Sequence, residues 1–178
     1  MCSSDLFVDA TCPLVTKVHN EASKFSHQRF ETVLIGHRGH QELKGTAGYV
    51  DPDYLHIVED EQDIDQLNVD KEAQVAVVTQ TTLSVDDTTQ MIDKLKERFP
   101  KLQAPPRSDL CYATQNRQDA VKELASICDV IIICGSPNSS NSNRLRETGE
   151  RYGCPSYIID MVDELDFSVL EEIGRAHV

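Results

Sequence analysis

The sequence lacks several features that define large functional classes. Its six cysteines form no C-x-x-C pair, which excludes a zinc ribbon and a thioredoxin-type redox motif. No apolar run approaches the roughly 20 residues of a transmembrane helix, and the first residues lack the basic and apolar regions of a signal peptide. Positive charge is scarce as well. The net charge is −13, which argues against nucleic acid or an anionic membrane surface as the main partner.

The remaining composition is that of a soluble globular protein, with 39% hydrophobic and 26% charged residues. We expect a reducing cytoplasm, in which thiols are buried or bind metal rather than form disulfides. Cys128, Cys134 and Cys154 lie in or beside apolar stretches, and we interpret them as buried small hydrophobic residues. An anionic small ligand stays compatible with the acidic chain, because local imidazoles, amides and helix N-termini decide such binding.

The two ends of the chain share an unusual feature. A DNA sequence that looks like a common sequencing adapter translates to residues 173–178, and its reverse complement contains a stretch that translates to residues 2–6. We therefore expect residues 1–6 and 173–178 to be adapter-derived scars that take no part in the fold. On this hypothesis the natural protein continues beyond both ends, and Cys2 and His177 have no function.

Strand-like and helix-like segments alternate along the chain, which predicts an α/β fold with a mainly parallel sheet. Pro13 fits the first turn of a helix, and Ser84 is a helix cap followed by acidic residues in its favoured first turn. The Pro-rich stretch 104–108 is the best linker. The predicted strands are 7–11 (the end of one), 32–36, 54–58, 73–79, 129–134 and 156–159, and the predicted helices are 13–28, 63–67, 84–99, 114–127, 141–152 and 162–171.

A glycine-rich loop, Gly36–Gly45, is predicted directly after the buried strand 32–36. Loops at the carboxyl ends of parallel strands are where open α/β sheets bind ligands. The imidazoles of His37 and His40 are suited to holding an anion, and the carboxyl of Glu42 to passing a proton. The alternative interpretation is a turn with solvated polar residues.

Other chemically useful residues also follow predicted strands. Cys12, Cys111 and the loops 80–84 and 135–143 all lie at strand-to-helix junctions, which gather at one edge of a parallel sheet. Two thiolates do not saturate an iron–sulfur cluster or a structural zinc, which takes about four ligands. The Ser139-Ser140-Asn141 run suits a phosphate, and a helix cap is its alternative role.

Five segments taken together resemble the 4-hydroxy-3-methylbut-2-enyl diphosphate reductase family, which catalyses the last step of the methylerythritol phosphate route to isoprenoids. They occur in family order and span nearly the whole chain outside the scars. The segments are 9–19 (DATCPLVTKVH), 36–42 (GHRGHQE), 79–84 (TQTTLS), 110–118 (LCYATQNRQ) and 135–145.

The resemblance implies three similar α/β domains in a trefoil around a 4Fe–4S cluster. Three cysteines hold that cluster and one iron stays open for the substrate's allylic hydroxyl. Cys12 and Cys111 match two of these cysteines, and the third belongs to a segment upstream of this chain. The implied domains are 7–12 (the end of the first), 13–108 (the second) and 109–172 (an incomplete third).

The resemblance also assigns roles to polar residues. Glu42 matches the acid implicated in proton delivery, and Thr81 matches a hydroxyl that positions substrate and acid. The residues matching contacts to the diphosphate and the site wall are His40, Ser139, Ser140, Asn141 and, more weakly, Thr114.

The implied reaction takes two electrons and two protons, expels the hydroxyl as water and gives isopentenyl and dimethylallyl diphosphate. The implied partners are this allylic diphosphate and a reducing protein such as ferredoxin or flavodoxin. Without its third cysteine, the chain alone is expected to hold a cluster poorly and to turn over little.

Two alternatives from other functional classes stay open. One is a hydrolase that binds a single metal ion through His37, His40 and Glu42, and tight zinc binding without thiols would favour it. The other is a non-catalytic module that binds a phosphorylated ligand on the same loops. Diphosphate binding without iron would support this second alternative.

Overall fold

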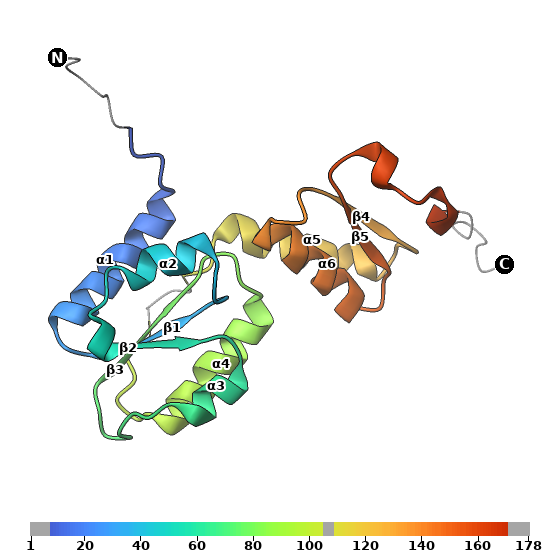
Figure 1. Cartoon of the computed structure of the whole chain (residues 1–178). Coiled ribbons are helices and arrows are strands. Elements are labelled where there is room, and N and C mark those ends of the chain that lie inside the picture. The colour runs from blue at the N-terminus through green and yellow to red at the C-terminus, as the bar shows by residue number, and fades with distance from the viewer. Residues whose placement is uncertain (1–7, 105–108, 171–178) are drawn as a thin grey trace, which may run out of the picture. The chain divides into compact units, whose positions relative to one another are not determined.

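The computed structural model describes residues 8–104 and 109–170, which form two compact units (Figure 1). The first unit comprises the described residues of Met1–Thr79 and Lys94–Asp109, and the second those of Gln80–Asp93 and Leu110–Val178. The predicted scars 1–6 and 173–178 lie outside the described residues. The domain limits predicted from the sequence stay predictions.

The first unit is built on a three-stranded parallel sheet in the order β2-β1-β3. Figure 1 shows α1 and α2 on one side of this sheet and α3 and α4 on the other. Burial on both faces explains why every residue of β3 is buried. The elements are α1 (Pro13–His27), β1 (Glu31–Ile35), α2 (Gln41–Ala47), the 3₁₀ turn η1 (Pro52–Tyr54), β2 (Leu55–Val58), α3 (Glu61–Gln66), β3 (Val75–Thr79) and the end of α4 (Val85–Arg98).

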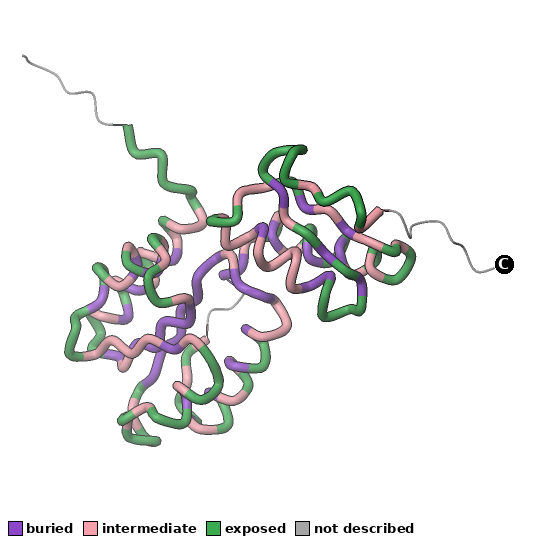
Figure 2. The backbone as a smooth tube through the Cα atoms, turned by 45° about the vertical axis from the view of Figure 1, so that its right-hand side comes forward, coloured by how far each residue is buried: buried purple, intermediate pink, exposed green. Residues whose placement is uncertain are grey.

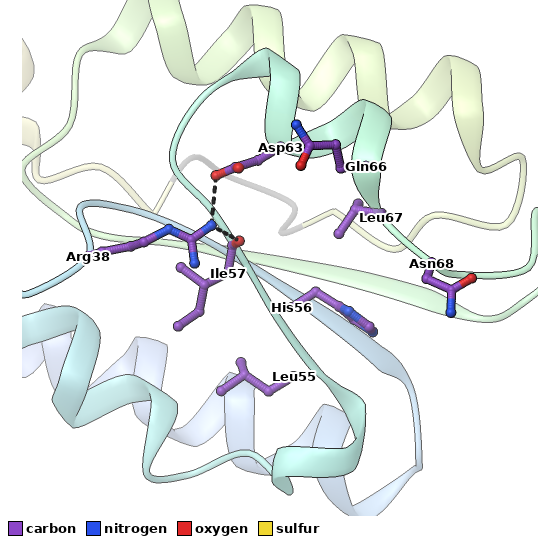
Figure 3. A pocket seen from close by; sticks show the side chains of 8 residues that line it. All are labelled: Arg38, Leu55, His56, Ile57, Asp63, Gln66, Leu67 and Asn68. Carbon is purple, nitrogen blue, oxygen red and sulfur yellow. Dashed lines mark hydrogen bonds and ion pairs between the residues drawn. The ribbon is translucent and has the colours of Figure 1, made fainter.

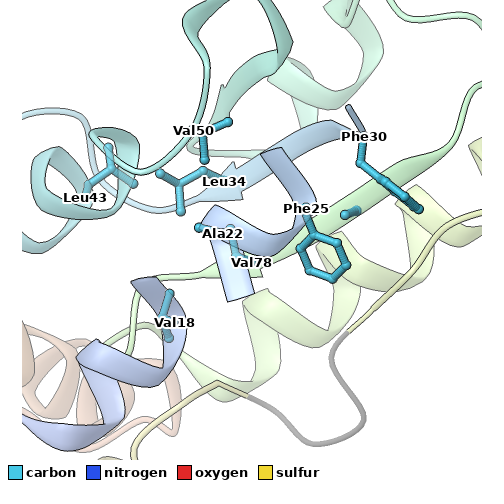
Figure 4. Close-up of a cluster of buried hydrophobic side chains, with 9 residues drawn as sticks. Val18, Ala22, Phe25, Phe30, Leu34, Leu43, Val50 and Val78 are labelled. Atoms are coloured by element: carbon cyan, nitrogen blue, oxygen red, sulfur yellow. The ribbon is translucent and has the colours of Figure 1, made fainter. Parts of the chain in front are cut away.

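Helix α1 forms because its apolar residues recur at helical spacing behind a proline in the first turn. Val18, Ala22 and Phe25 make its buried face, which packs on Leu34 of β1 (Figure 4). This cluster packs α1 and α2 against the sheet. The packing fixes where each of the two helices begins relative to the sheet. The whole cluster is Val18, Ala22, Phe25, Phe30, Leu34, Leu43, Val50, Ala76 and Val78.

The second unit contains a parallel pair of strands, β4 and β5, with Ile131 opposite Ser156. Its small core consists of Val121, Ile131, Ile133 and Cys154. Gly149 of α6 faces Ser156 so closely that a Cβ atom would collide with the serine hydroxyl. The elements are the first turns of α4, α5 (Tyr112–Ala125), β4 (Ile131–Cys134), α6 (Ser140–Arg151), β5 (Ser156–Ile159), η2 (Val162–Glu164) and η3 (Phe167–Leu170).

Most predicted elements are confirmed, including the parallel pairing and the cap of α4, where Ser84 Oγ accepts a hydrogen bond from the Asp87 N–H at 3.2 Å. The predicted strand end at 7–11 is wrong for residues 8–11, which are exposed and pair with no strand of the described chain. The helix predicted at 162–171 is instead two short 3₁₀ turns, η2 and η3. No helix among the described residues is long and apolar enough to cross a membrane.

The cysteine prediction is only partly confirmed. Cys154 is buried, Cys128 is half-buried and Cys134 is exposed. Side chains alternate between the two faces of a strand. Ile131 and Ile133 occupy the buried face of β4, so Cys134 falls on the other face. Figure 2 colours the backbone by burial and shows how buried and exposed stretches follow one another along the described chain.

Candidate active site

Cys12 is a free, exposed cysteine at the N-cap position of α1. Its backbone carbonyl accepts the first helical hydrogen bond, from the Thr16 N–H at 3.0 Å. Among the described residues, Cys12 makes no side-chain capping bond, so its sulfur is available to a ligand. The first N–H groups of the helix point toward this end and have no partner within the helix.

The predicted loop at 36–45 is partly wrong, because α2 begins at Gln41. Gly39 has a φ of +93°, a conformation that L side chains rarely adopt, and it lets the chain turn sharply before the helix. His40 then caps the helix: its Nδ1 accepts a hydrogen bond from the Glu42 N–H at 3.3 Å. An accepting Nδ1 puts the ring hydrogen on Nε2, which is thereby a donor for an anion.

Aromatic stacking joins α1 to the segment directly after α2, at Tyr49. The rings of His19 and Tyr49 stack with centroids 4.5 Å apart. A Cβ atom on Gly45 would lie 3.5 Å from His19 Nε2, so the two helices approach closely here. The two helices that begin with Cys12 and with His40 therefore pack directly against each other.

The other polar residues of the 36–42 segment are engaged within the fold. The Arg38 guanidinium donates to the Ile57 carbonyl at 3.0 Å and to the Asp63 carboxylate at 2.9 Å (Figure 3). His37 Nδ1 lies 3.4 Å from a carboxylate oxygen of Glu59. Arg38 borders a cavity of about 290 Å³ between β2 and α3. That cavity contains no predicted site residue, and its lining is Arg38, Leu55, His56, Ile57, Asp63, Gln66, Leu67 and Asn68.

A buried carboxylate joins α1 to the segment that precedes Cys111. Asp109 is fully buried, and the Lys17 ammonium donates to its Oδ1 at 3.0 Å. Burial raises the pKa of Asp109 to about 6, against the opposing effect of Lys17. The nearby Glu21 carboxylate raises this pKa further, and a backbone hydrogen bond from Thr79 lowers it.

In the second unit, Cys111 is the N-cap of α5 as Cys12 is of α1. Cys111 is a free, half-buried thiol whose backbone N–H donates to the Thr81 carbonyl at 3.0 Å. Gln115 Nε2 donates to the Leu110 carbonyl at 3.0 Å and steadies the approach to the helix. The structure thus brings together two predicted site residues, Thr81 and Cys111, by a backbone hydrogen bond.

A group of hydroxyls and one amide lies beside this bond. Gln80 Nε2 donates to Thr82 Oγ1 at 2.9 Å and to Ser140 Oγ at 3.3 Å. Thr82 Oγ1 in turn donates to Ser140 Oγ at 3.2 Å. Sequence reasoning missed Gln80, although an amide next to two threonines at the end of a buried strand is a usable signal. Ser140 is therefore connected to the 80–84 loop.

The neighbours of Ser140 have different surroundings. Ser139 Oγ accepts from the Ser142 N–H at 3.3 Å, so the helix-cap alternative is confirmed for Ser139. Within the described chain, the buried Asn141 Oδ1 has no hydrogen-bond partner, which makes it an open polar position at the start of α6. Thr114 is buried on α5, only 3% exposed.

The donor set fits a cluster in part. Each cysteine thiol stands at a helix start, and each unit supplies one. In the described ranges, no three His, Cys, Asp or Glu side chains gather to hold a metal ion. A 4Fe–4S cluster therefore needs ligands beyond these two thiols. The alternative of a single metal on His37, His40 and Glu42 is not supported, because His37 faces Glu59 and the His40 Nδ1 caps α2.

Comparison with known proteins gives consistent results. A family model described as "LytB protein" matches residues 2–178. The 4-hydroxy-3-methylbut-2-enyl diphosphate reductase of Acinetobacter baylyi is 55% identical over 173 residues, which are 96% of this chain and 55% of that protein. The reductase of the same name from Pseudomonas aeruginosa is 56% identical over 170 residues, with 94% and 54% covered. The chain thus spans about half the length of the curated relatives it matches.

Two solved structures are also similar. The E-1-hydroxy-2-methyl-but-2-enyl-4-diphosphate reductase from Plasmodium falciparum matches with a TM-score of 0.89 and 38% identity, covering 93% of this chain and 52% of that one. A structure of (E)-4-hydroxy-3-methyl-but-2-enyl diphosphate reductase matches with a TM-score of 0.55 and 29% identity, covering 93% and 58%.

Proposed function

Because this chain belongs to the LytB protein family, we propose that it is part of a 4-hydroxy-3-methylbut-2-enyl diphosphate reductase. The observation that carries the proposal is the bond between the Cys111 N–H and the Thr81 carbonyl, in a chain 55% identical to a protein of that name. It joins a free thiol at a helix start to a loop of hydroxyls. Such a pairing suits a site that holds a metal cluster beside a polar substrate.

Cys12 and Cys111 would hold a 4Fe–4S cluster together with ligands from outside this chain. When bound, this cluster would supply the electrons and a Lewis-acidic iron for the allylic hydroxyl. The protein residues then have the task of orienting the substrate and moving protons. Both thiols occupy N-cap positions, and the unpaired N–H groups of a helix start favour a negatively charged group there.

The diphosphate would be held by neutral donors rather than by a basic surface. His40 Nε2–H is the available donor in the first unit. In the second unit the open atom of Asn141 is its Oδ1, which accepts rather than donates and would therefore bind a water or a protonated group beside the diphosphate. Ser139 keeps its hydroxyl hydrogen, because its oxygen acts as acceptor in the cap of α6. Ser140, Thr81 and Thr114 complete the proposed wall, and Thr81 orients the substrate and the acid.

Glu42 would be the proton donor. The hydrogen bond from its backbone N–H to His40 fixes its backbone, so the Glu42 side chain extends from a defined position in the first turn of α2. One proton goes to the allylic oxygen, which leaves as water when the C–O bond breaks. A second proton goes to carbon and gives isopentenyl or dimethylallyl diphosphate. The two electrons would come from a ferredoxin- or flavodoxin-type protein in the cytoplasm.

A chimera tests this proposal directly. Residues 8–170 of this chain would replace the matching segment of the Acinetobacter baylyi reductase, and turnover of the allylic diphosphate would be measured without oxygen. We expect a turnover within about tenfold of that of the parent. Glu42→Gln should lower the turnover about 100-fold or more with iron and sulfide content unchanged. Glu61→Gln, at an exposed position of α3, is the matched control.

Two outcomes would contradict the proposal. A folded chimera with full cluster content and no turnover would show that this segment does not supply a reductase half. Near-normal turnover of the Glu42→Gln chimera would remove Glu42 as the proton donor. For the 178-residue chain alone, we expect anaerobic reconstitution to give no stoichiometric cubane cluster by iron and sulfide analysis and EPR. Pyrophosphate binding without iron, combined with an inactive chimera, would favour the non-catalytic binding module.

A further inference from the structure

The segment Gln115–Gln118 belongs to the motif that resembles the reductase family, yet the proposed reaction gives Gln118 no task. Gln118 is only 1% exposed. It follows the N-cap Cys111 by seven residues, which is almost two helical turns and places both on the same side of α5. A buried amide on the helix face that begins with Cys111 needs hydrogen-bond partners, because an unpaired buried amide lowers the stability of the fold.

Both ends of the Gln118 amide bind the backbone that follows the 80–84 loop. Its Nε2 donates to the Leu83 carbonyl at 2.9 Å. Its Oε1 accepts from the Val85 N–H at 3.1 Å. Val85 is the first residue of α4, where a helix has N–H groups without an internal partner. Of the side chains with this length, glutamine is the one that donates and accepts at the same time at neutral pH.

The loop is therefore bonded to α5 at three points. The Cys111 N–H binds the Thr81 carbonyl at 3.0 Å, and the Gln118 amide binds Leu83 and Val85. Thr81, Leu83 and Val85 are alternate residues along one short segment, so their positions are fixed together. All these residues belong to the second unit.

We propose that Gln118 is a positioning residue that clamps the 80–84 loop to α5. The clamp sets the Thr81 hydroxyl at a fixed place relative to the Cys111 thiol. The functional role of the clamp, which is to align a substrate-binding hydroxyl with a cluster-binding thiol, rests on the proposed function. The clamp itself is a property of the folded second unit and is measurable without a cluster or a substrate.

Amide hydrogen exchange of the 178-residue chain, followed by NMR, tests the clamp. In Gln118→Met, which keeps the length of the side chain and loses both hydrogen bonds, exchange of the Val85 and Cys111 amides should become at least tenfold faster. The Gly135 amide, which binds the Ile159 carbonyl at 2.9 Å, is the reference for the rest of the unit and should change less than twofold. Asn116→Met, at an exposed position of α5, is the matched control.

A second variant distinguishes a clamp from a side chain that only fills space. The carboxylate of Gln118→Glu accepts from Val85 but cannot donate to Leu83, so the Cys111 amide should again exchange faster at pH 7. A protonated carboxyl donates and accepts as glutamine does, so protection relative to wild type should return as the pH falls through the pKa of the introduced carboxyl, which burial raises above its ordinary value. The nearby charges of Asp86 and Lys122 are paired with each other at 3.0 Å. Measuring exchange over the same pH range in wild type and in Gln118→Met corrects for any effect of these two charges.

Equal acceleration of the Gly135 amide would overturn the clamp, because Gln118 would then stabilise the whole unit. Unchanged exchange in both variants would overturn it as well. Pyrophosphate added to the wild-type chain tests the proposed function separately, through the NMR shifts of Thr81 and Asn141. If pyrophosphate moves neither shift, the proposed diphosphate site fails while the exchange data still decide the clamp.

Discussion

Removing the charge of Lys17 should destabilise the chain in a strongly pH-dependent way. Lys17 binds a fully buried carboxylate, Asp109, whose Oδ2 has no hydrogen-bond partner within the described chain. Lys17→Met keeps most of the side chain's apolar stem and deletes the ammonium. The variant must then bury an unpaired carboxylate at neutral pH or keep Asp109 protonated.

The magnitude follows from the pKa of Asp109. Burial raises this pKa from 3.8 to about 6, and at about 1.36 kcal/mol per unit this corresponds to about 3 kcal/mol. Because the pKa is higher in the folded state, folding favours the protonated form. That contribution to stability is complete below about pH 3.8 and is lost as the pH rises through about 6. Lys17 reduces the loss by stabilising the carboxylate.

Deleting one partner of a buried ion pair costs about 3–5 kcal/mol. The Lys17 side chain is 42% exposed, so water already screens this pair. We therefore expect Lys17→Met to lower the free energy of unfolding by about 2 kcal/mol at pH 8. At pH 5 Asp109 is mostly protonated with or without Lys17, so the loss should fall below about 1 kcal/mol.

Urea unfolding followed by circular dichroism at pH 5 and pH 8 measures both values. Lys24→Met, at an exposed position of α1, is the matched control and should be nearly neutral at both pH values. Adding Asp109→Asn to Lys17→Met removes the unpaired charge and should recover most of the stability at pH 8. An equal loss at the two pH values, or a double variant no more stable than Lys17→Met, would refute this reasoning.

Three further predictions concern other parts of the chain. Arg151 binds both carboxylate oxygens of Asp87 at 2.7 and 3.1 Å and lowers the pKa of Asp87; the stability this gives is present above the ordinary carboxyl pKa and is lost as the pH falls. Asp87→Asn should therefore cost up to about 1 kcal/mol at pH 7 and less at pH 3, as measured by thermal unfolding, since the pair is partly exposed. Leu34→Ala empties a fully buried position of β1 and should cost about 3 kcal/mol in urea unfolding, and a cost below about 1 kcal/mol would mean that the cluster repacks freely. In the chimera, Cys134→Ser should keep iron and sulfide content while Cys12→Ser should lose it, and cluster loss in Cys134→Ser would make the ligand assignment wrong.

The alternating elements were predictable because their signals are local. Val18, Ala22 and Phe25 recur at helical spacing, and β3 is a continuous apolar run. Each element can therefore be predicted from a short stretch of sequence. Helix α2 escaped prediction because it is only seven residues long and contains Gly45. Its cap is the ring nitrogen of His40 instead of a Ser, Thr, Asp or Asn oxygen.

The contacts around the candidate site were less predictable, because they depend on tertiary packing. Gln80 and Gln118 are both amides within quoted motifs, but nothing in the one-dimensional pattern shows that the first binds hydroxyls and the second binds backbone. Cys134 looked like a core residue because it ends an apolar run. The strand alternation that turns it outward depends on which face of β4 the helices cover.

Ser139, Ser140 and Asn141 belong to one motif, but they differ in how many of their hydrogen-bonding groups are already used within the fold. Ser140 accepts from Gln80 and Thr82 and donates to the Thr82 carbonyl at 3.4 Å, so its hydroxyl has little capacity left for a ligand. Ser139 accepts one bond and still has its hydrogen to donate. Asn141 keeps a buried polar atom that no group of the described chain satisfies, and such an atom is costly unless a ligand or water binds it. If this segment binds a diphosphate, Ser139 therefore donates its hydroxyl hydrogen to it, while the Oδ1 of Asn141 accepts from a water or a protonated group beside it. Ser140 serves to join the start of α6 to the 80–84 loop.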